Sequence, residues 1–131
     1  MNTSEDNPAD WYLLAAQRLR AADIIHGVEG ATWTGIELLQ EAVERYLKGW
    51  LIGRGWKLER THDLGQLIQA ATGYSVEFQS FSDFADDLTQ QFWLQHYPGD
   101  ELSEQPLNYD ELRQQTTALL GVIFKGDKSN A

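Results

Sequence analysis

The sequence predicts an all-α fold, an antiparallel up-and-down bundle of four to five helices. Apolar residues recur every three or four positions in five segments, and no useful length of chain alternates with a period of two. The three prolines lie outside these segments, and glycine clusters separate several of them. Because short connections make consecutive helices neighbours, an antiparallel bundle is expected. We expect one domain over residues 10–124, with flexible tails at 1–9 and 126–131.

The first three predicted helices cover residues 10–26, 34–53 and 61–72. The first has Asp10 in the position of an N-cap, where a short polar side chain accepts a hydrogen bond from the first turn. The second has an apolar stripe wider than one helix contact needs, which is typical of a central helix or of one shared with a second subunit. The third has Asp63 in its first turn, where the helix dipole favours a negative charge.

The last two predicted helices cover residues 81–97 and 109–124. Pro98 ends the fourth helix, because proline cannot continue the hydrogen-bonding pattern. Asn108 stands in the N-cap position of the fifth helix, whose apolar residues again follow the helical period.

Composition limits the classes of function. The chain has 131 residues, no cysteine and a net charge of −10. The lack of cysteine excludes disulfides, thiolate metal sites and a cysteine nucleophile, and it fits a reducing cytoplasm. The negative charge disfavours broad binding to nucleic acid or to an anionic membrane. The acidic, polar start predicts no signal peptide. We therefore expect a cytoplasmic protein without a membrane span, a metal site or a cofactor.

The basic residues are unevenly distributed. Half of the ten fall within sixteen positions, while residues 61–112 hold ten acidic residues and no Lys or Arg. Such a cluster on an acidic body can hold one phosphate group or nucleotide, although solvation and helix pairing explain the same charges. The members of this basic island are Arg45, Lys48, Arg54, Lys57 and Arg60.

Three stretches carry a resemblance to a known family. Residues 40–51 (QEAVERYLKGWL) are similar to a helix pattern of two adjacent Gln, Ala, then Glu-Lys, Leu-Lys-Ala and Leu. Residues 60–64 (RTHDL) are similar to a Thr-His-Asp-Leu helix start, and residues 93–99 (WLQHYPG) to an Arg-Tyr-Pro helix end. In this order they resemble the HEPN family (higher eukaryote and prokaryote nucleotide-binding), whose members are small helical domains. The resemblance extends over nearly all of residues 10–124.

Candidate binding residues come from these stretches. Gln40, Glu44 and Lys48 are spaced four apart, so they form one polar stripe on an otherwise apolar helix and need partners there. His62 lies at a predicted helix start, where backbone N–H groups favour an anion. Facing elements could bring these groups together with Arg60 around a phosphate or a carboxylate. The candidate nucleotide- or partner-binding residues are Gln40, Glu44, Lys48, Arg60, Thr61, His62, Asp63, His96 and Tyr97.

The chain departs from the pattern of RNA-cleaving family members. These carry Arg, four to six residues and then His late in the bundle. Here Arg20 and His26 have that spacing on the first helix, where a six-residue step leaves the side chains roughly 120° apart. The Arg of Arg-Tyr-Pro is replaced by His96. The sequence therefore assigns no catalytic residue and favours a binding module over an enzyme.

The resemblance implies an accessory module that binds a nucleotide, a separate minimal nucleotidyltransferase, or both, in a two-component system similar to a toxin–antitoxin pair. The wide apolar face of the second helix predicts a homodimer. Two alternatives remain open. One is a diverged RNA-cleaving toxin that uses His96, Arg20 or His26, and the other is a purely structural dimeric interaction protein.

Overall fold

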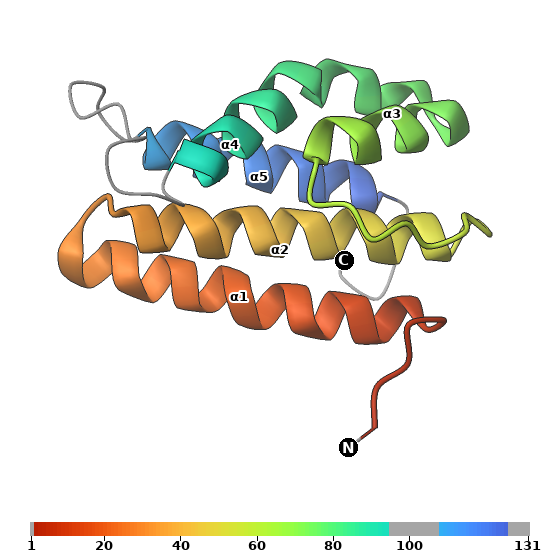
Figure 1. Ribbon diagram of the computed structural model, residues 1–131, viewed down its shortest axis with the longest axis horizontal. Coiled ribbons are helices and arrows are strands. Elements are labelled where there is room, and N and C mark those ends of the chain that lie inside the picture. Colours follow the sequence, from red (N-terminus) through yellow and green to blue (C-terminus); the bar gives the residue numbers. More distant parts are fainter. Residues whose placement is uncertain (1, 95–107, 126–131) are drawn as a thin grey trace.

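A computed structural model describes residues 2–94 and 108–125 of the chain (Figure 1). These residues form five α-helices and one 3-10 helix, η1, and contain no β-strand. The prediction of an all-α bundle is therefore confirmed. The elements are α1 (Pro8–Glu29), α2 (Trp33–Ile52), α3 (Leu64–Tyr74), η1 (Val76–Phe81), α4 (Ser82–Leu94) and α5 (Tyr109–Ile123).

Helix α2 is the centre of the bundle. It runs antiparallel to α1 along its length and also packs against α3, α4 and α5 (Figure 1). Thirteen of its twenty residues are buried. Its wide apolar stripe is thus covered within one chain, which answers the choice between a central helix and a helix shared with a second subunit for the described residues.

Helix α1 is longer than predicted. It begins at Pro8, and Asn7 rather than Asp10 is its N-cap, with a side chain that accepts a hydrogen bond from a first-turn N–H. Proline is favoured in the first turn because no intrahelical partner is available to the N–H that it lacks. The helix continues past the predicted range of 10–26 until Gly30, whose φ of 76° is readily adopted only by glycine.

The other helices differ from the prediction mainly at their ends. Thr32 caps α2, and its hydroxyl accepts a hydrogen bond of 3.0 Å from the N–H of Gly35. The 3-10 helix over Val76–Phe81 was not predicted, because so short a segment has no periodic pattern. The predicted end of the fourth helix at Pro98 lies outside the described residues.

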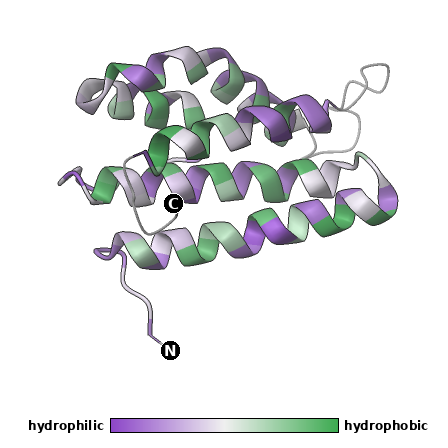
Figure 2. Ribbon diagram, turned by 180° about the vertical axis from the view of Figure 1, so that it is seen from behind, coloured by the Kyte–Doolittle hydropathy of each residue, from purple (hydrophilic) through white to green (hydrophobic). Residues whose placement is uncertain are grey.

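The hydrophobic core surrounds α2 and includes residues of every described helix. Figure 2 shows hydrophobic and hydrophilic residues interleaved along α1 and α2, as expected for helices with one buried and one exposed side. None of the described helices combines the length and the apolar character that crossing a lipid bilayer requires.

Long side chains connect α1 to α5. Among the described helices, α2 is the one whose backbone lies close to that of α1. Arg113 donates to both oxygens of Asp23, at 2.8 and 3.1 Å, and the Tyr109 hydroxyl donates to the same carboxylate at 3.2 Å. The hydrogen bonds from Arg113 lower the pKa of Asp23 below its ordinary value. The ring of His26 stacks on Tyr109, with centroids 4.2 Å apart, and its Nε2 lies 2.9 Å from Asp110.

Candidate functional site

The polar stripe of α2 is buried. Gln40 is 0% exposed, and Glu44 and Lys48 are each 4% exposed. Burying charged and amide groups is unfavourable unless they have partners. The partners come from the stripe itself and from His62, in the connection that leads from α2 into α3.

Glu44 joins two of these groups through separate oxygens. Its Oε2 accepts a hydrogen bond of 2.9 Å from Lys48 Nζ, and its Oε1 lies 2.9 Å from Nδ1 of His62. Gln40 Nε2 donates to the backbone carbonyl of His62 at 2.8 Å. We call Gln40, Glu44, Lys48 and His62 the Glu44 cluster. It fixes the backbone and the side chain of His62 against α2.

The start of α3 differs from the prediction. The helix begins at Leu64, and Asp63 is its N-cap rather than a first-turn residue. The Asp63 carboxylate accepts from the N–H groups of Gly65 (2.9 Å) and Gln66 (3.4 Å). Thr61 lies before the helix, and its hydroxyl accepts from the N–H of Asp63 at 3.1 Å. Asp63 is the N-cap because its carboxylate reaches two N–H groups of the first turn that have no partner within the helix.

These caps change the expected role of the helix start. The remaining first-turn donor, the N–H of Leu64, donates to the hydroxyl of Thr89 on α4 at 3.2 Å. The three N–H groups at this helix start therefore already have protein acceptors and are not open to an external anion. Thr61 and Asp63 shape the backbone, whereas the side chain of His62 is 61% exposed and contacts Glu44.

A pocket lies beside the Glu44 cluster. Its volume is about 310 Å³, at the lower end of the range for small-molecule sites. It is formed by α1, α2 and the connection between α2 and α3. The lining residues are Trp11, Glu44, Arg45, Lys48, Leu58, Arg60 and His62.

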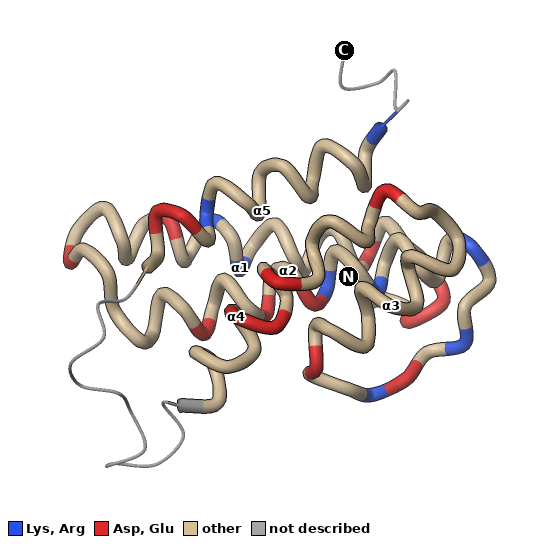
Figure 3. The backbone as a smooth tube through the Cα atoms, turned by 90° about the horizontal axis from the view of Figure 1, so that it is seen from above, with Lys and Arg blue, Asp and Glu red and all other residues tan. Residues whose placement is uncertain are grey.

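The charges of the pocket are mostly positive. Arg45, Lys48 and Arg60 face one acidic lining residue, Glu44, which is already bound to Lys48. Figure 3 shows blue basic positions on the connection between α2 and α3, whereas α4 carries acidic positions alone and α3 carries no charged residue. The pocket lining thus holds three basic side chains and one acidic side chain on a protein whose net charge is −10. Two acidic side chains outside the lining, Glu41 and Glu5, pair with Arg45 and Arg60.

Only part of the basic island reaches this pocket. The guanidinium of Arg54 lies 4.1 Å from the ring centre of Trp50 and lines a different cavity, beside Tyr74. Arg45 is held by α2 itself, where it donates to the carbonyl of Glu41 at 3.1 Å. Burial lowers the pKa of Arg45, and the nearby Arg18 adds to this effect. The expectation of one shared basic site therefore holds for three of the five residues.

Trp11 is the aromatic residue of the pocket. Its ring lies 5.9 Å from Lys48 Nζ, within the range of a cation–π contact. Its indole N–H donates to the carbonyl of Glu5 at 2.9 Å. Trp11 and Arg45 also line a second cavity of about 290 Å³ next to the first. One indole therefore forms a boundary between two adjoining spaces.

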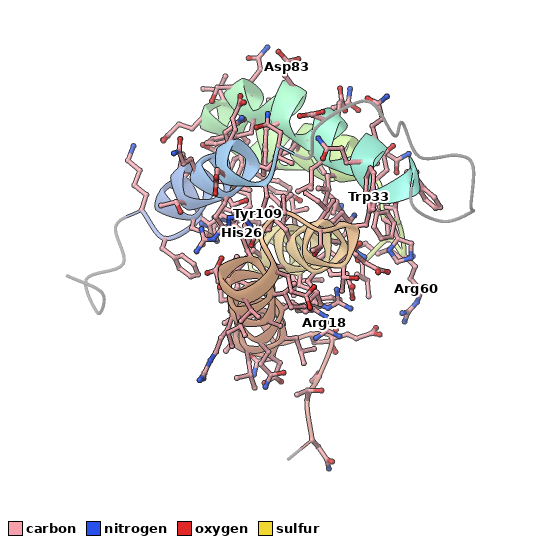
Figure 4. All side chains as sticks on the ribbon, turned by 90° about the vertical axis from the view of Figure 1, so that its left-hand side faces the viewer. Arg18, His26, Trp33, Arg60, Asp83 and Tyr109 are labelled. Carbon is pink, nitrogen blue, oxygen red and sulfur yellow. The ribbon has the colours of Figure 1, made fainter. Side chains whose placement is uncertain are left out.

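Arg20 and His26 do not form a pair. Both lie on the unbroken helix α1, so the helical geometry keeps their side chains roughly 120° apart. Figure 4 shows His26 beside Tyr109 near the middle of the view, well apart from Arg60 at the right-hand edge. The contacts of His26 are made to α5. His96 and Tyr97 lie outside the described residues.

The structure adds residues that the candidate set did not contain: Trp11, Arg45 and Leu58 in the pocket, and Glu5 beside it. Arg45 belongs to the basic island, so charge clustering was a signal for it. Trp11 has the spacing of a core residue, and no pattern distinguishes an aromatic residue at a pocket from one in the core. Among the described residues, no three His, Asp or Glu side chains are grouped so that they could hold a metal ion.

Comparison with known proteins gives one finding. A family model described as HEPN domain matches residues 9–123, which is most of the chain. This range contains all five helices except the first residue of α1. No curated protein and no solved structure shows a significant match.

Proposed function

Because the chain belongs to the HEPN family, we propose that it is a nucleotide-binding accessory module and that a phosphate group of the ligand binds in the pocket beside the Glu44 cluster. The observation that carries the proposal is the meeting of Arg45, Lys48, Arg60 and His62 in one pocket of an acidic protein. A small positive site on a negative surface can hold one phosphorylated small molecule, while the surrounding charge repels a long polyanion.

The roles within the pocket follow from exposure. The side chain of Lys48 is 5% exposed and its ammonium is bound to Glu44, so it orders the pocket wall and is not the main phosphate donor. The side chain of Arg60 is 77% exposed, and guanidinium groups bind phosphate oxygens with two parallel N–H groups. His62 supplies a ring edge at the rim. Trp11 offers an aromatic surface of the kind on which bases stack.

Isothermal titration of ATP into the full chain tests this function. We expect saturable binding, and Arg60→Ala should weaken it about tenfold or more, because a charge-assisted hydrogen bond is lost. Lys57→Ala is the matched control, since Lys57 is an exposed member of the basic island that does not line the pocket. Its affinity should stay within about twofold of the wild type.

The absence of nucleotide binding would contradict this function. If millimolar ATP and GTP produce neither heat nor a thermal shift, the nucleotide-binding function is wrong, and the purely structural interaction protein becomes the better account. Equal losses in Arg60→Ala and Lys57→Ala would place the ligand outside this pocket.

The partner is part of the same proposal. The family resemblance points to a separate minimal nucleotidyltransferase in a two-component, toxin–antitoxin-like system, and a neighbouring reading frame for such an enzyme would support it. The RNA-cleaving alternative is less favoured, since Arg20 and His26 diverge on α1 and His26 is bound to Asp110 and Tyr109. Growth arrest on expression that His26→Ala relieves would restore that alternative.

A further inference from the structure

The residues before α1 fold back onto it. We call Ser4, Glu5, Asp6 and Asn7 the N-terminal arm. The N–H of Ser4 donates to Asp10 Oδ2 at 2.9 Å, and the carbonyl of Glu5 accepts from the Trp11 indole at 2.9 Å. The sequence predicted a flexible tail here, but in the structure the arm has defined contacts with the first two turns of α1. It forms one wall of the second cavity. This cavity adjoins the pocket beside the Glu44 cluster, which we call the main pocket.

The arm places a carboxylate on the exposed cation of the pocket. Arg60 Nη2 donates to both oxygens of Glu5, at 2.8 and 3.0 Å. Glu5 lines the second cavity, Arg60 lines the main pocket, and Trp11 lines both. The carboxylate therefore lies at the border between the two spaces, on the guanidinium that is most accessible to a ligand.

We propose that Glu5 is an internal competitor for the phosphate of the ligand, so that binding must first release Glu5 from Arg60. This inference rests on the proposed function, because it concerns the same pocket. A carboxylate and a phosphate are both oxyanions that a guanidinium recognises through the same donors. While Glu5 is bound to Arg60, the N–H donors of the guanidinium that face Glu5 are not available to the phosphate. The Glu5 carboxylate also repels the phosphate.

The exposure of the pair matches a competitor that can be displaced. The side chain of Arg60 is 77% exposed and that of Glu5 is 52% exposed. Ion pairs of this kind contribute little to stability because water and salt screen them. A phosphate with more charge than a carboxylate can replace Glu5 without disturbing the core.

The test compares four full-length variants with the wild type by isothermal titration of ATP. In Glu5→Gln the competing charge is removed, and the dissociation constant should fall about two- to fivefold, the size expected for release of an exposed ion pair. Asp6→Asn is the matched control. It makes the same change of charge one residue away, at an exposed side chain for which the described residues show no ion pair.

Arg60→Ala and the double variant Glu5→Gln/Arg60→Ala complete a double-mutant cycle. In this cycle Glu5→Gln should have no effect on ATP affinity once Arg60 is absent.

Two further probes separate phosphate from base. Tripolyphosphate, which has no base, should gain affinity in Glu5→Gln as ATP does, and adenosine, which has no phosphate, should not. The outcomes are distinguishable. If ATP binds but Glu5→Gln and Asp6→Asn have the same affinity for it, the proposal that Glu5 competes with the phosphate is wrong. The proposed function then still stands. If ATP, ADP and tripolyphosphate bind to none of the proteins, the proposed function is wrong and this inference falls with it.

Discussion

At the scale of single residues, Glu44 determines how the pocket is arranged. One carboxylate neutralises the buried ammonium of Lys48 and orients the ring of His62. The pair with Lys48 is one turn long and local to α2, whereas the contact with His62 joins positions eighteen residues apart. Loss of Glu44 therefore affects the stability of α2 and the shape of the pocket together.

We expect Glu44→Leu to lower the free energy of unfolding by about 3 to 5 kcal/mol, because Lys48 would remain buried without a counter-ion. Adding Lys48→Met should recover most of that loss, since an apolar pair of similar size replaces the ion pair. Urea denaturation of the two single variants and the double variant measures this coupling. Losses that simply add would show that Lys48 finds another partner or reaches water.

At the scale of elements, side chains of α1 pack closely against α2 at Gly49. A methyl group there would lie 2.8 Å from Trp11 Cβ and 2.8 Å from Tyr12 Cε1. The family pattern described above has alanine at this position of Leu-Lys-Ala. Glycine lets the aromatic side chains of α1 lie directly against the backbone of α2, and it thereby places Trp11 at the pocket.

Gly49→Ala should therefore lower the free energy of unfolding by about 1 to 3 kcal/mol through overpacking. Gly27→Ala is the control within α1, where the new methyl group meets nothing within 4 Å. It should raise the same free energy by about 0.5 to 1 kcal/mol, because alanine is the better helix former. Thermal or urea unfolding checks both, and a Gly49→Ala protein as stable as wild type would mean that α1 shifts at little cost.

Much of this element structure could be predicted from the sequence, because helical periodicity and buried faces are local properties. The stripe of Gln40, Glu44 and Lys48 follows from spacing alone. The start of α3 cannot be predicted in this way, since Thr61 and Asp63 are both good N-cap residues. The choice between them depends on which side chain reaches the free N–H groups of the first turn. The contact of Glu5 with Arg60 has no signal in the sequence, because it joins residues fifty-five positions apart.

At the scale of the whole molecule, three of the six large hydrophobic residues that are exposed among the described residues lie on α1, and none lies on α2. Among the exposed large hydrophobic residues are Leu13, Ile24 and Val28, at 39%, 55% and 80% exposure. They lie on the side of α1 that faces away from α2, because the opposite side carries the buried Ala15, Leu19 and Ala22. The homodimer was predicted from the face of α2, and that face is occupied within the chain.

We propose that the protein forms a homodimer through this outward side of α1. Sedimentation velocity at rising protein concentration should then show a dimer, and Ile24→Glu/Val28→Glu should shift it to monomer, because charged groups would be buried in the interface. Val76→Glu is the control, since Val76 is 71% exposed on η1. A wild-type protein that sediments as a monomer throughout, or a dimer that survives the double change, would contradict the proposal.

The position of the N-terminal arm also affects how the protein should be prepared. An affinity tag fused to the amino end would extend the few residues that hold Glu5 against Arg60 and Trp11. The added chain would begin a few residues before Glu5, next to the contacts on which the proposed competition depends. Titrations should therefore be carried out on protein from which any such tag has been cleaved.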